Sequence, residues 1–369
     1  MKSQHIQTTR ARTALAFLFT ATLTLTAGLT ADALAQGRGA PQAPPDPVIT
    51  QVRDNLYKVE TGPGVAAVTV FLVTPEGIVL ADTENTRVAT WLKTELARRF
   101  PGRPVRYVLE THYHWDHQQG GAVFADTARF IGHANMPGKL TGPVGQARPA
   151  GDSDDLDGDG RLSREESQTA TRAQFDVLDR NRDGFLTQQE ISADVRPPDI
   201  TFADRYTVEL GGSRVELIWA KNRHTSDLYD IYFPNERVLF AQDYVWVDRL
   251  CCNFAFDRTP LADWIASVRA LEALDFDIVV TSHWNQGTKA DVVEFRRYLE
   301  AVRDAVSGGI AAGQTLEQMQ QTIRLPEFAH FIGYSGEPAF ATPSLAQVIE
   351  SAYLNLTRYS TPPAGAARE

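Results

Sequence analysis

The 369-residue sequence predicts an α/β (α+β) fold that is interrupted by an inserted segment and extended by C-terminal helices. Runs rich in β-branched residues alternate with helical patterns at 48–141 and again at 200–290, as in layered domains. Between them, residues 142–199 are rich in Gly, Pro and Asp and break the alternation. From 291 to 369 the pattern is helical. We therefore expect one domain built from two halves, an insertion and a helical extension.

The N-terminus has the features of an export signal. Basic residues precede the apolar run TALAFLFTATLTLTAGLTA, and the small-x-small sequence Ala33-Leu34-Ala35 follows it. This order predicts a signal peptide at 1–35, cleaved after Ala35, and a periplasmic or secreted protein without a stable membrane anchor after cleavage. An uncleaved anchor is the alternative. Residues 36–47 are rich in Pro and Gly and are expected to form a linker.

Charge and cysteine content restrict the partners. Removal of residues 1–35, which carry a net charge of +2, changes the formal charge from −10 to −12. An acidic surface repels phosphate backbones, so we expect a small-molecule substrate and no nucleic-acid partner. The oligomeric state is left open. The only cysteines are the adjacent Cys251 and Cys252, for which a vicinal disulfide and two small buried hydrophobes are both considered and the second is favoured.

Individual elements can be assigned in order along the chain. The first half predicts strands at 55–62, 65–74, 77–83 and 105–112 and a helix at 86–100. The pattern breaks after Phe130-Ile131-Gly132, and residues 136–155 are expected to form a loop. The second half and the extension predict strands at 205–220, 227–234, 237–247 and 276–284, and helices at 260–274, 290–308 and 344–359.

Four metal-binding side chains lie within six positions, directly after the strand predicted at 105–112. They are His112, His114, Asp116 and His117. In an extended loop, His112 and His114 can point to one side while Asp116 and His117 turn to the other, which suits two adjacent metal ions. Neutral imidazole and carboxylate are usual zinc ligands. A single histidine is more often structural, but four candidate ligands in six positions favour a metal site.

The segment HYHWDH resembles the His-x-His-x-Asp-His motif of the metallo-β-lactamase fold superfamily. Three later segments match that family's remaining motifs in the same order, and they contribute His224, Asp243 and His283. The resemblance covers about 48–135 and 200–290, and it implies a four-layer αββα sandwich. It also implies two zinc ions per chain, one held by His112, His114 and His224, one held by Asp116, His117 and His283, and both bridged by Asp243 as in the glyoxalase II-like branch.

The same resemblance implies a hydrolase. A hydroxide bridging two zinc ions would attack an ester, thioester, lactone or β-lactam-like amide, with Asp116 as the catalytic residue that orients it. Asp82 is expected to support the ligands, and Tyr244 and Asn285 are candidates for oxyanion stabilisation. A mononuclear iron dioxygenase on the same fold is the main alternative. His133 and His330 lie outside the motifs and are interpreted as structural.

Two segments of the insertion, 155–166 and 179–190, resemble the twelve-residue calcium loop of an EF-hand. The resemblance implies up to two calcium ions in an EF-hand pair, for which a structural role is favoured. The residues before the first loop are too rich in Gly and Pro for an entering helix, so that loop is expected to be the looser site. A calcium-binding interaction module on a catalytically idle scaffold is a further alternative. The implied calcium ligands are Asp155, Asp157, Asp159, Arg161 (backbone) and Glu166 in the first loop, and Asp179, Asn181, Asp183, Phe185 (backbone) and Glu190 in the second.

Overall fold

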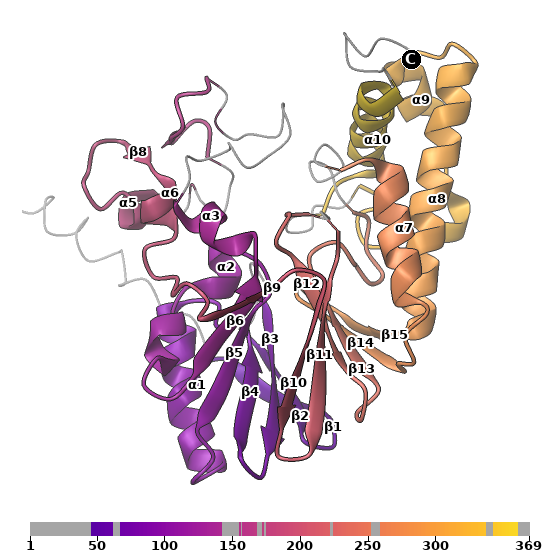
Figure 1. Cartoon of the computed structure of the whole chain (residues 1–369). Coiled ribbons are helices and arrows are strands. Elements are labelled where there is room, and N and C mark those ends of the chain that lie inside the picture. The colour runs from indigo at the N-terminus through magenta and orange to yellow at the C-terminus, as the bar shows by residue number, and fades with distance from the viewer. Residues whose placement is uncertain are drawn as a thin grey trace, which may run out of the picture. The chain divides into compact units, whose positions relative to one another are not determined.

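Two β-sheets pack face to face at the centre of the protein, as the computed structural model shows (Figure 1). Their facing sides share one apolar core, in which Leu72 and Leu109 of the first sheet meet Leu217 and Phe240 of the second. The structure describes residues 46–61, 67–141, 155, 157–167, 172, 175–221, 224–251, 259–336 and 342–360. The predicted signal peptide and most of the linker lie outside these residues.

The first sheet has seven strands in the order β1-β2-β3-β4-β5-β6-β9. Strands β1 to β4 are antiparallel neighbours, whereas β4, β5, β6 and β9 run parallel to one another, so their C-terminal ends meet at one edge. The seven strands are β1 (Val48–Arg53), β2 (Leu56–Glu60), β3 (Val68–Thr74), β4 (Gly77–Ala81), β5 (Val105–Glu110), β6 (Arg129–His133) and β9 (Ile200–Phe202).

The second sheet has six strands in the order β10-β11-β12-β13-β14-β15. Strands β13 and β14 are parallel, and the other neighbouring pairs are antiparallel. The predicted strand at 237–247 ends at Ala241, because residues 242 onward form a loop. The six strands are β10 (Arg205–Leu210), β11 (Ser213–Trp219), β12 (Tyr229–Phe233), β13 (Val238–Ala241), β14 (Ile278–Thr281) and β15 (Gln286–Thr288).

Helices cover the outer face of each sheet and complete a four-layer αββα arrangement. Helix α1 (Thr86–Arg99) packs on the first sheet through residues such as Leu92 and Leu96. Its N-cap is the side chain of Asn85, which accepts a hydrogen bond from the Val88 amide. The second sheet is covered by α7 (Leu261–Leu271), α8 (Lys289–Ala311) and α10 (Leu345–Ser360).

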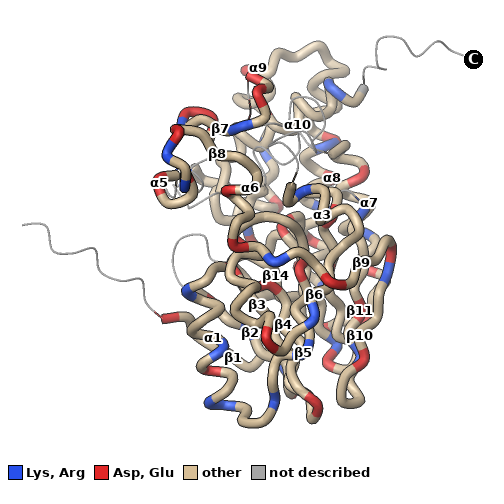
Figure 2. The backbone as a smooth tube through the Cα atoms, turned by 60° about the vertical axis from the view of Figure 1, so that its left-hand side comes forward, with Lys and Arg blue, Asp and Glu red and all other residues tan. Residues whose placement is uncertain are grey.

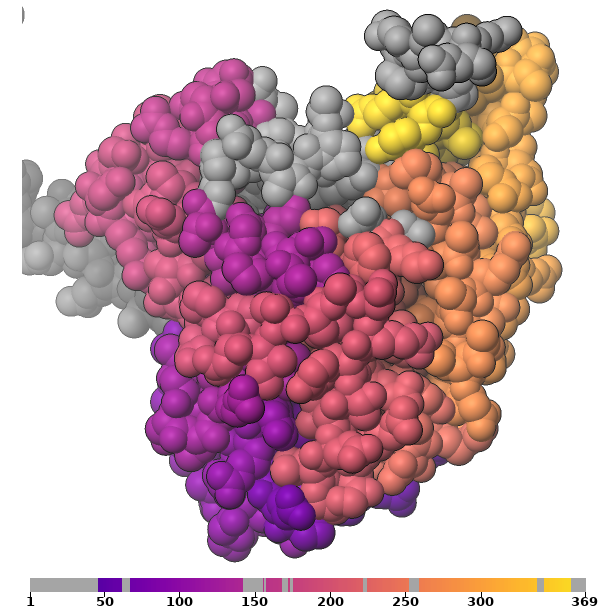
Figure 3. Space-filling model, in the orientation of Figure 1, coloured from indigo at the N-terminus to yellow at the C-terminus, as the bar shows by residue number. Residues whose placement is uncertain are grey.

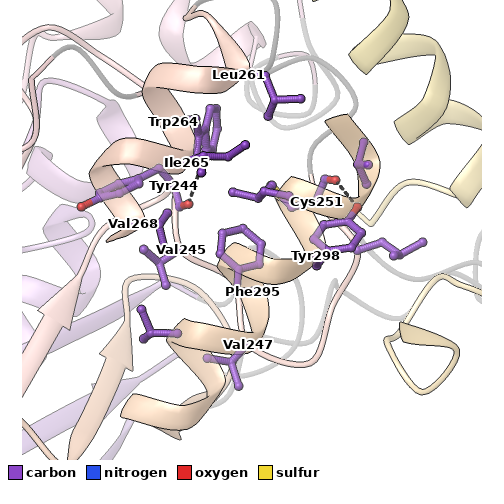
Figure 4. Packing of buried hydrophobic residues seen from close by; sticks show 14 of the residues in the cluster. Tyr244, Val245, Val247, Cys251, Leu261, Trp264, Ile265, Val268, Phe295 and Tyr298 are labelled. Carbon is purple, nitrogen blue, oxygen red and sulfur yellow. Dashed lines mark hydrogen bonds between the residues drawn. The ribbon is translucent and has the colours of Figure 1, made fainter. Parts of the chain in front are cut away.

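The helices on the second sheet form the largest apolar cluster of the described residues (Figure 4). Trp264 of α7 and Phe295 and Tyr298 of α8 are buried there, and the Tyr298 hydroxyl donates a hydrogen bond to the Cys251 carbonyl. The predicted helical extension thus completes the outer layer, together with α9 (Leu316–Thr322) and the short helix η3 (Pro326–Phe328). None of the helices in the described ranges has the length and apolar content needed to cross a membrane.

The inserted segment leaves the first sheet after β6 and returns in β9, which pairs with β6. Strand β9 lies at the start of the predicted second half, yet it belongs to the first sheet. Helix α3 (Met136–Thr141) follows β6 and precedes the insertion. The insertion contains β7 (Leu162–Ser163), α5 (Phe175–Leu178), β8 (Phe185–Leu186) and α6 (Gln188–Ile191). Acidic residues gather on its β7 and β8 loops (Figure 2).

One sequence interpretation is corrected by the fold. Cys251 is buried and forms a disulfide, so the favoured interpretation of two reduced cysteines is wrong. Cys252 lies outside the described residues. Adjacent cysteines can pair despite the absence of a wider disulfide framework, and composition alone does not separate the two states.

Candidate metal centres

The predicted zinc ligands lie where strands end at one edge of the sandwich. His112 and His114 follow β5, and Asp116 and His117 lie in the single helical turn α2 (Trp115–Gln118). His224 precedes β12, Asp243 follows β13 and His283 follows β14. Since β4 and β5 are parallel, as are β13 and β14, their C-terminal ends bring residues distant in sequence to the same edge.

The first group consists of His112, His114, His224 and Asp243. Nε2 of His224 lies 3.0 Å from Nδ1 of His114 and 3.2 Å from Oδ2 of Asp243. Nε2 of His112 lies 3.6 Å from the same Asp243 oxygen. His224 adopts a positive φ of 56°, a strained backbone conformation that non-glycine residues rarely take and that is concentrated at functional sites.

The second group consists of Asp116, His117 and His283. Nε2 of His283 lies 3.3 Å from Nε2 of His117 and 3.6 Å from Oδ2 of Asp116. Oδ1 of Asp243 lies 3.3 Å from Nε2 of His117, and its Oδ2 lies 3.4 Å from Nε2 of His283. Asp243 therefore contacts both groups, which is the position that a bridging ligand requires.

The geometry of the two groups fits zinc. Tetrahedral ligands at zinc–donor distances of about 2.0–2.1 Å are separated from one another by roughly 3.3 Å. The donor separations above, from 3.0 to 3.6 Å, lie around that value. Nε2 of His112 is fully buried without a hydrogen-bond partner among the described residues, as expected for an atom directed at a cation. These residues can therefore hold two zinc ions.

The electrostatics of the groups also favour a bound cation. Burial raises the pKa of Asp243, but the surrounding imidazoles of His117, His283, His112 and His224 outweigh burial and hold that pKa well below its usual value. Burial lowers the pKa of His117, and the carboxylates of Asp243 and Asp116 reverse this and raise it well above its usual value. The carboxylates of Asp243 and Asp116 thus favour a positive charge at His117, which a bound cation would supply in place of the proton.

Asp82 orients one ligand and anchors its segment, in agreement with the supporting role expected from the sequence. The fully buried carboxylate accepts a hydrogen bond from Nδ1 of His117 at 3.0 Å, which directs Nε2 of that ring toward the second group. It also accepts from the backbone N–H and hydroxyl of Thr111 and from the amide of Gln118. The positive φ of 61° at Asp82 shows that the backbone is strained to make this arrangement.

Two residues of the site have no motif that identifies them from the sequence. The Ser282 hydroxyl donates a 2.6 Å hydrogen bond to Oδ1 of Asp243 and holds that carboxylate from outside the group. Glu84 is buried, its backbone N–H donates to the His117 carbonyl, and burial raises its pKa to about 8. In the sequence, only their positions indicate that they belong to the site, since Ser282 precedes His283 and Glu84 lies two residues after Asp82.

The two oxyanion candidates are turned to other partners. Tyr244 is buried, and its hydroxyl donates to Oδ2 of Asp230 beside a cavity of about 460 Å³ between the second sheet and α7. The Tyr244 prediction is wrong, because its side chain lies on the helix-covered face of the sheet. The Asn285 amide donates to the Val247 carbonyl, so it stabilises the loop after β13.

The two remaining described histidines differ from one another. His133 is buried, stacks on Trp219, and its ring nitrogens contact the Ala203 carbonyl and the Asn135 amide, which agrees with a structural role. His330 is exposed and lies 3.5 Å from Glu294 on the surface of the C-terminal extension. Neither residue lies in the two buried groups.

The two acidic loops of the insertion have matching conformations. In each loop the first Asp accepts from the amide of the glycine five positions later, Asp155 from Gly160 and Asp179 from Gly184. The last Glu of each loop, Glu166 or Glu190, accepts from amides at the third and ninth positions. Positive φ angles recur at the fourth and sixth positions: Gly158, Gly160, Arg182 and Gly184.

The carboxylates of both loops consequently turn inward. Ligand oxygens of Asp155, Asp157 and Glu166 lie within 4.8 Å of one another. The two loops are joined by the antiparallel pairing of Leu162 with Leu186, which occupy equivalent loop positions. The expectation that the first loop is the looser site stays a prediction.

Comparisons with known proteins extend this description. A linear primary-alkylsulfatase from Pseudomonas sp. (strain ATCC 19151) is 23% identical over 286 residues, covering 71% of this chain and 50% of that protein. The 2,4-dinitroanisole O-demethylase subunit alpha from Nocardioides sp. (strain JS1661) is 25% identical over 275 residues, covering 69% and 68%. The chain therefore spans about half the length of the alkylsulfatase it matches.

Similarity to solved structures concerns the fold. The structure of a stereoselective inverting sec-alkylsulfatase from Pseudomonas sp. matches with a TM-score of 0.61 and 16% identity over 88% of this chain and 52% of that chain. The family model of the metallo-beta-lactamase superfamily matches residues 59–283, which is more than half of the sequence and includes all seven predicted zinc ligands. The chain thus belongs to the metallo-beta-lactamase superfamily.

Proposed function

We propose that this protein is a zinc-dependent hydrolase of small ester-type substrates, with alkyl sulfate esters as the first class to test. The observation that carries the proposal is the convergence of seven ligand side chains into two groups that Asp243 joins. The substrate class is suggested by the name of the alkylsulfatase relative. Thioester, lactone and β-lactam-like amide bonds remain within the proposal because the same groups can serve their hydrolysis.

The chain's own residues would divide the work between binding and orientation. Bound zinc would supply an activated water and a Lewis acid for the substrate oxygen. Asp116 lies at the rim of the second group with 18% of its side chain exposed, so its carboxylate can accept a hydrogen bond from that water and orient it. Asp82 and Ser282 would keep His117 and Asp243 in place.

A substrate panel tests the hydrolase proposal. Zinc-loaded protein would be assayed against a long-chain alkyl sulfate, an aryl sulfate, an aryl acetate, a thioester, a lactone and a chromogenic cephalosporin. We expect turnover of at least one substrate, and we expect Asp116→Asn to lose most of that activity while keeping the circular dichroism spectrum of the folded protein. Absence of turnover on every substrate, with two zinc ions bound, would reject the proposal.

We further propose that the insertion binds calcium through its two acidic loops. The proposal is supported by the matching inward-facing oxygens of the loops and by the pairing of Leu162 with Leu186. Sites lined by oxygen ligands suit calcium better than zinc. Calcium titration of the zinc-loaded protein by calorimetry should give one or two binding events.

Export is proposed from the sequence of residues 1–35. We propose cleavage after Ala35, which leaves a periplasmic or secreted protein that acts on a small molecule and contacts neither nucleic acid nor membrane stably. Mass spectrometry of the protein recovered from the periplasm or medium would test this, since the mature chain should begin at Gln36. Recovery of the intact chain in the membrane fraction would contradict it.

A further inference from the structure

The segment that carries four of the zinc ligands has a second side, which contacts the insertion. Tyr113 and Trp115 alternate with His112, His114 and Asp116 in sequence. Tyr113 packs against the cluster of Met136, Leu140 and Val195. The ligand side chains of this segment therefore face the metal groups, whereas Tyr113 contacts the cluster of Met136, Leu140 and Val195.

Trp115 contacts the apolar core of the insertion itself. That core, here called the insert core, consists of Leu162, Phe175, Leu178, Leu186 and Ile191, and Trp115 packs against it. Leu162 and Leu186 lie inside the two acidic loops, and Ile191 directly follows the last loop residue, Glu190. A shift of the loops would therefore move the surface on which Trp115 rests.

Hydrogen bonds connect the same two regions. The Gln119 side chain donates to the Ile191 carbonyl at 3.2 Å, and the Gly120 amide donates to the Asp194 carbonyl at 3.1 Å. Gln119 also forms an isolated bridge with Val195. The ligand segment is thus attached to the end of the second acidic loop immediately after α2. Figure 1 shows α2 directly beside α3 and α6.

We infer that Trp115 is a positioning residue through which calcium binding to the insertion controls the zinc affinity of the metal centre. This inference rests on the proposed function, both in its zinc site and in its calcium loops. Glu190 and the other loop oxygens would together hold the calcium ion. The insert core would thereby be ordered beneath Trp115, and His114 and Asp116 on either side of Trp115 would be held where they can bind zinc.

Thermodynamic linkage makes this inference quantitative. If calcium raises zinc affinity by a given factor, zinc must raise calcium affinity by the same factor. Couplings between sites typically amount to 5- to 150-fold, and we expect about tenfold here. Zinc affinity would be measured on the full chain by competition with a chromogenic chelator, with and without calcium, and calcium affinity with and without zinc.

Two matched substitutions in α5 separate the insert core from the insertion's surface. Leu178→Ala removes a buried member of the core, whereas Val177→Ala changes a neighbouring side chain that is 76% exposed. We expect Leu178→Ala to abolish most of the effect of calcium on zinc affinity and Val177→Ala to preserve it. Neither residue is a proposed ligand of either metal.

Substitution of Trp115 tests the positioning role directly. In Trp115→Ala, zinc affinity should no longer respond to calcium, and it should be about tenfold weaker than in calcium-loaded wild type. The calcium affinity of this variant should equal that of zinc-free wild type. Trp115→Phe should restore part of the response, because it keeps an aromatic contact. Hydrogen exchange of zinc-free wild type adds a readout independent of activity, since calcium should slow the amides of residues 113–120.

The outcomes distinguish this inference from the proposed function. Zinc affinity that is identical with and without calcium in wild type, absence of calcium binding, or an undiminished calcium effect in Trp115→Ala would each overturn the inference while the zinc hydrolase proposal stands. Failure of the wild type to bind zinc at all, whether or not calcium is present, would instead overturn both the proposed function and the inference that rests on it.

Discussion

The metal centre and the acidic loops of the insertion are built in opposite ways. The seven side chains of the metal centre come from segments between His112 and His283, and the folding of two sheets brings them together. Each acidic loop places its oxygens within twelve consecutive residues and holds them with its own amides. The side chains of the metal centre therefore come together only when the two sheets fold, whereas the carboxylates of each acidic loop are positioned by the local conformation of that loop.

The two regions also differ in how they meet solvent. His112 and His117 are buried, and Asp243 has 9% of its side chain exposed. Carboxylates of the loops, such as Asp183 with 43% of its side chain exposed, lie near the surface. Figure 3 shows the described residues of the insertion, in magenta, on the surface at the upper left of the view. We therefore expect zinc in the buried groups to be required for the reaction, and calcium in the loops near the surface to affect mainly local order and stability.

The largest effect is expected from Asp243→Asn. The substitution leaves the volume of the side chain nearly unchanged but removes the charge that joins the two groups. We expect kcat/KM to fall by at least about a thousandfold, because the proposed bridging ligand is lost. Asp248→Asn, on the exposed loop five residues later, is the matched control and should retain activity. Comparable activity of the two variants would contradict the bridging role.

A smaller effect on activity, of about 10- to 100-fold, is expected for Asp82→Asn. Asparagine can accept from only one oxygen, so the hydrogen bond that orients His117 is weakened while the ligand itself remains. Zinc affinity and kcat/KM should fall together. Asp54→Asn is a suitable control, since Asp54 has a similar positive φ of 47° on the surface. An unchanged zinc affinity in Asp82→Asn would show that His117 needs no such partner.

The insertion should respond to calcium through stability. At free calcium about a hundredfold above its dissociation constant, binding to the folded state stabilises by roughly 2.7 kcal/mol. For a chain of this size that corresponds to a rise in Tm of several degrees. Glu190→Gln should lose much of the rise, with two zinc ions still bound at saturating zinc. Glu165→Gln is the control and should keep the rise, because Glu165 is an exposed residue of the first loop that is not one of its implied ligands. Melting curves that calcium leaves unchanged in wild type would refute calcium binding.

The smallest effect concerns a buried carboxyl outside both regions. Burial raises the pKa of Asp230 from its ordinary value to about 7. The folded state therefore binds a proton that the unfolded state releases, so the free energy of unfolding decreases as pH rises from about 4 to 7 and is not reduced further by this group above 7. Asp230→Asn should remove that part of the pH dependence. The free energy of unfolding of wild type and of Asp230→Asn would be measured by denaturant unfolding at pH 5 and pH 8. If the two proteins differed by the same amount at both pH values, a contribution from Asp230 to the pH dependence would be excluded.

Much of the metal centre could be predicted because short motifs carry it. Four of the ligands lie within the six positions from His112 to His117. His224, Asp243 and His283 each follow or precede a recognisable strand. The four-layer arrangement follows from the alternation of strands and helices and from the family that those motifs indicate. Local patterns and motif order therefore determine most of the site.

Other features depend on contacts that no local pattern records. The side of the second sheet to which Tyr244 points is decided by the end of β13 at Ala241, after which the chain leaves the strand alternation. The membership of β9 in the first sheet depends on its pairing with β6 across the insertion. The contact of Trp115 with the insert core likewise arises only when the described residues of the insertion pack against α2.

Metal analysis of the purified mature protein tests the central claim most directly. The arrangement of donors around Asp243 predicts about two zinc ions per chain, and Asp243→Asn should retain fewer. Elemental analysis by mass spectrometry after dialysis would give the stoichiometry, with calcium determined in the same sample. Two equivalents of zinc in wild type would agree with a dinuclear hydrolase. One equivalent of iron that resists exchange with zinc would contradict it and would indicate a mononuclear iron dioxygenase.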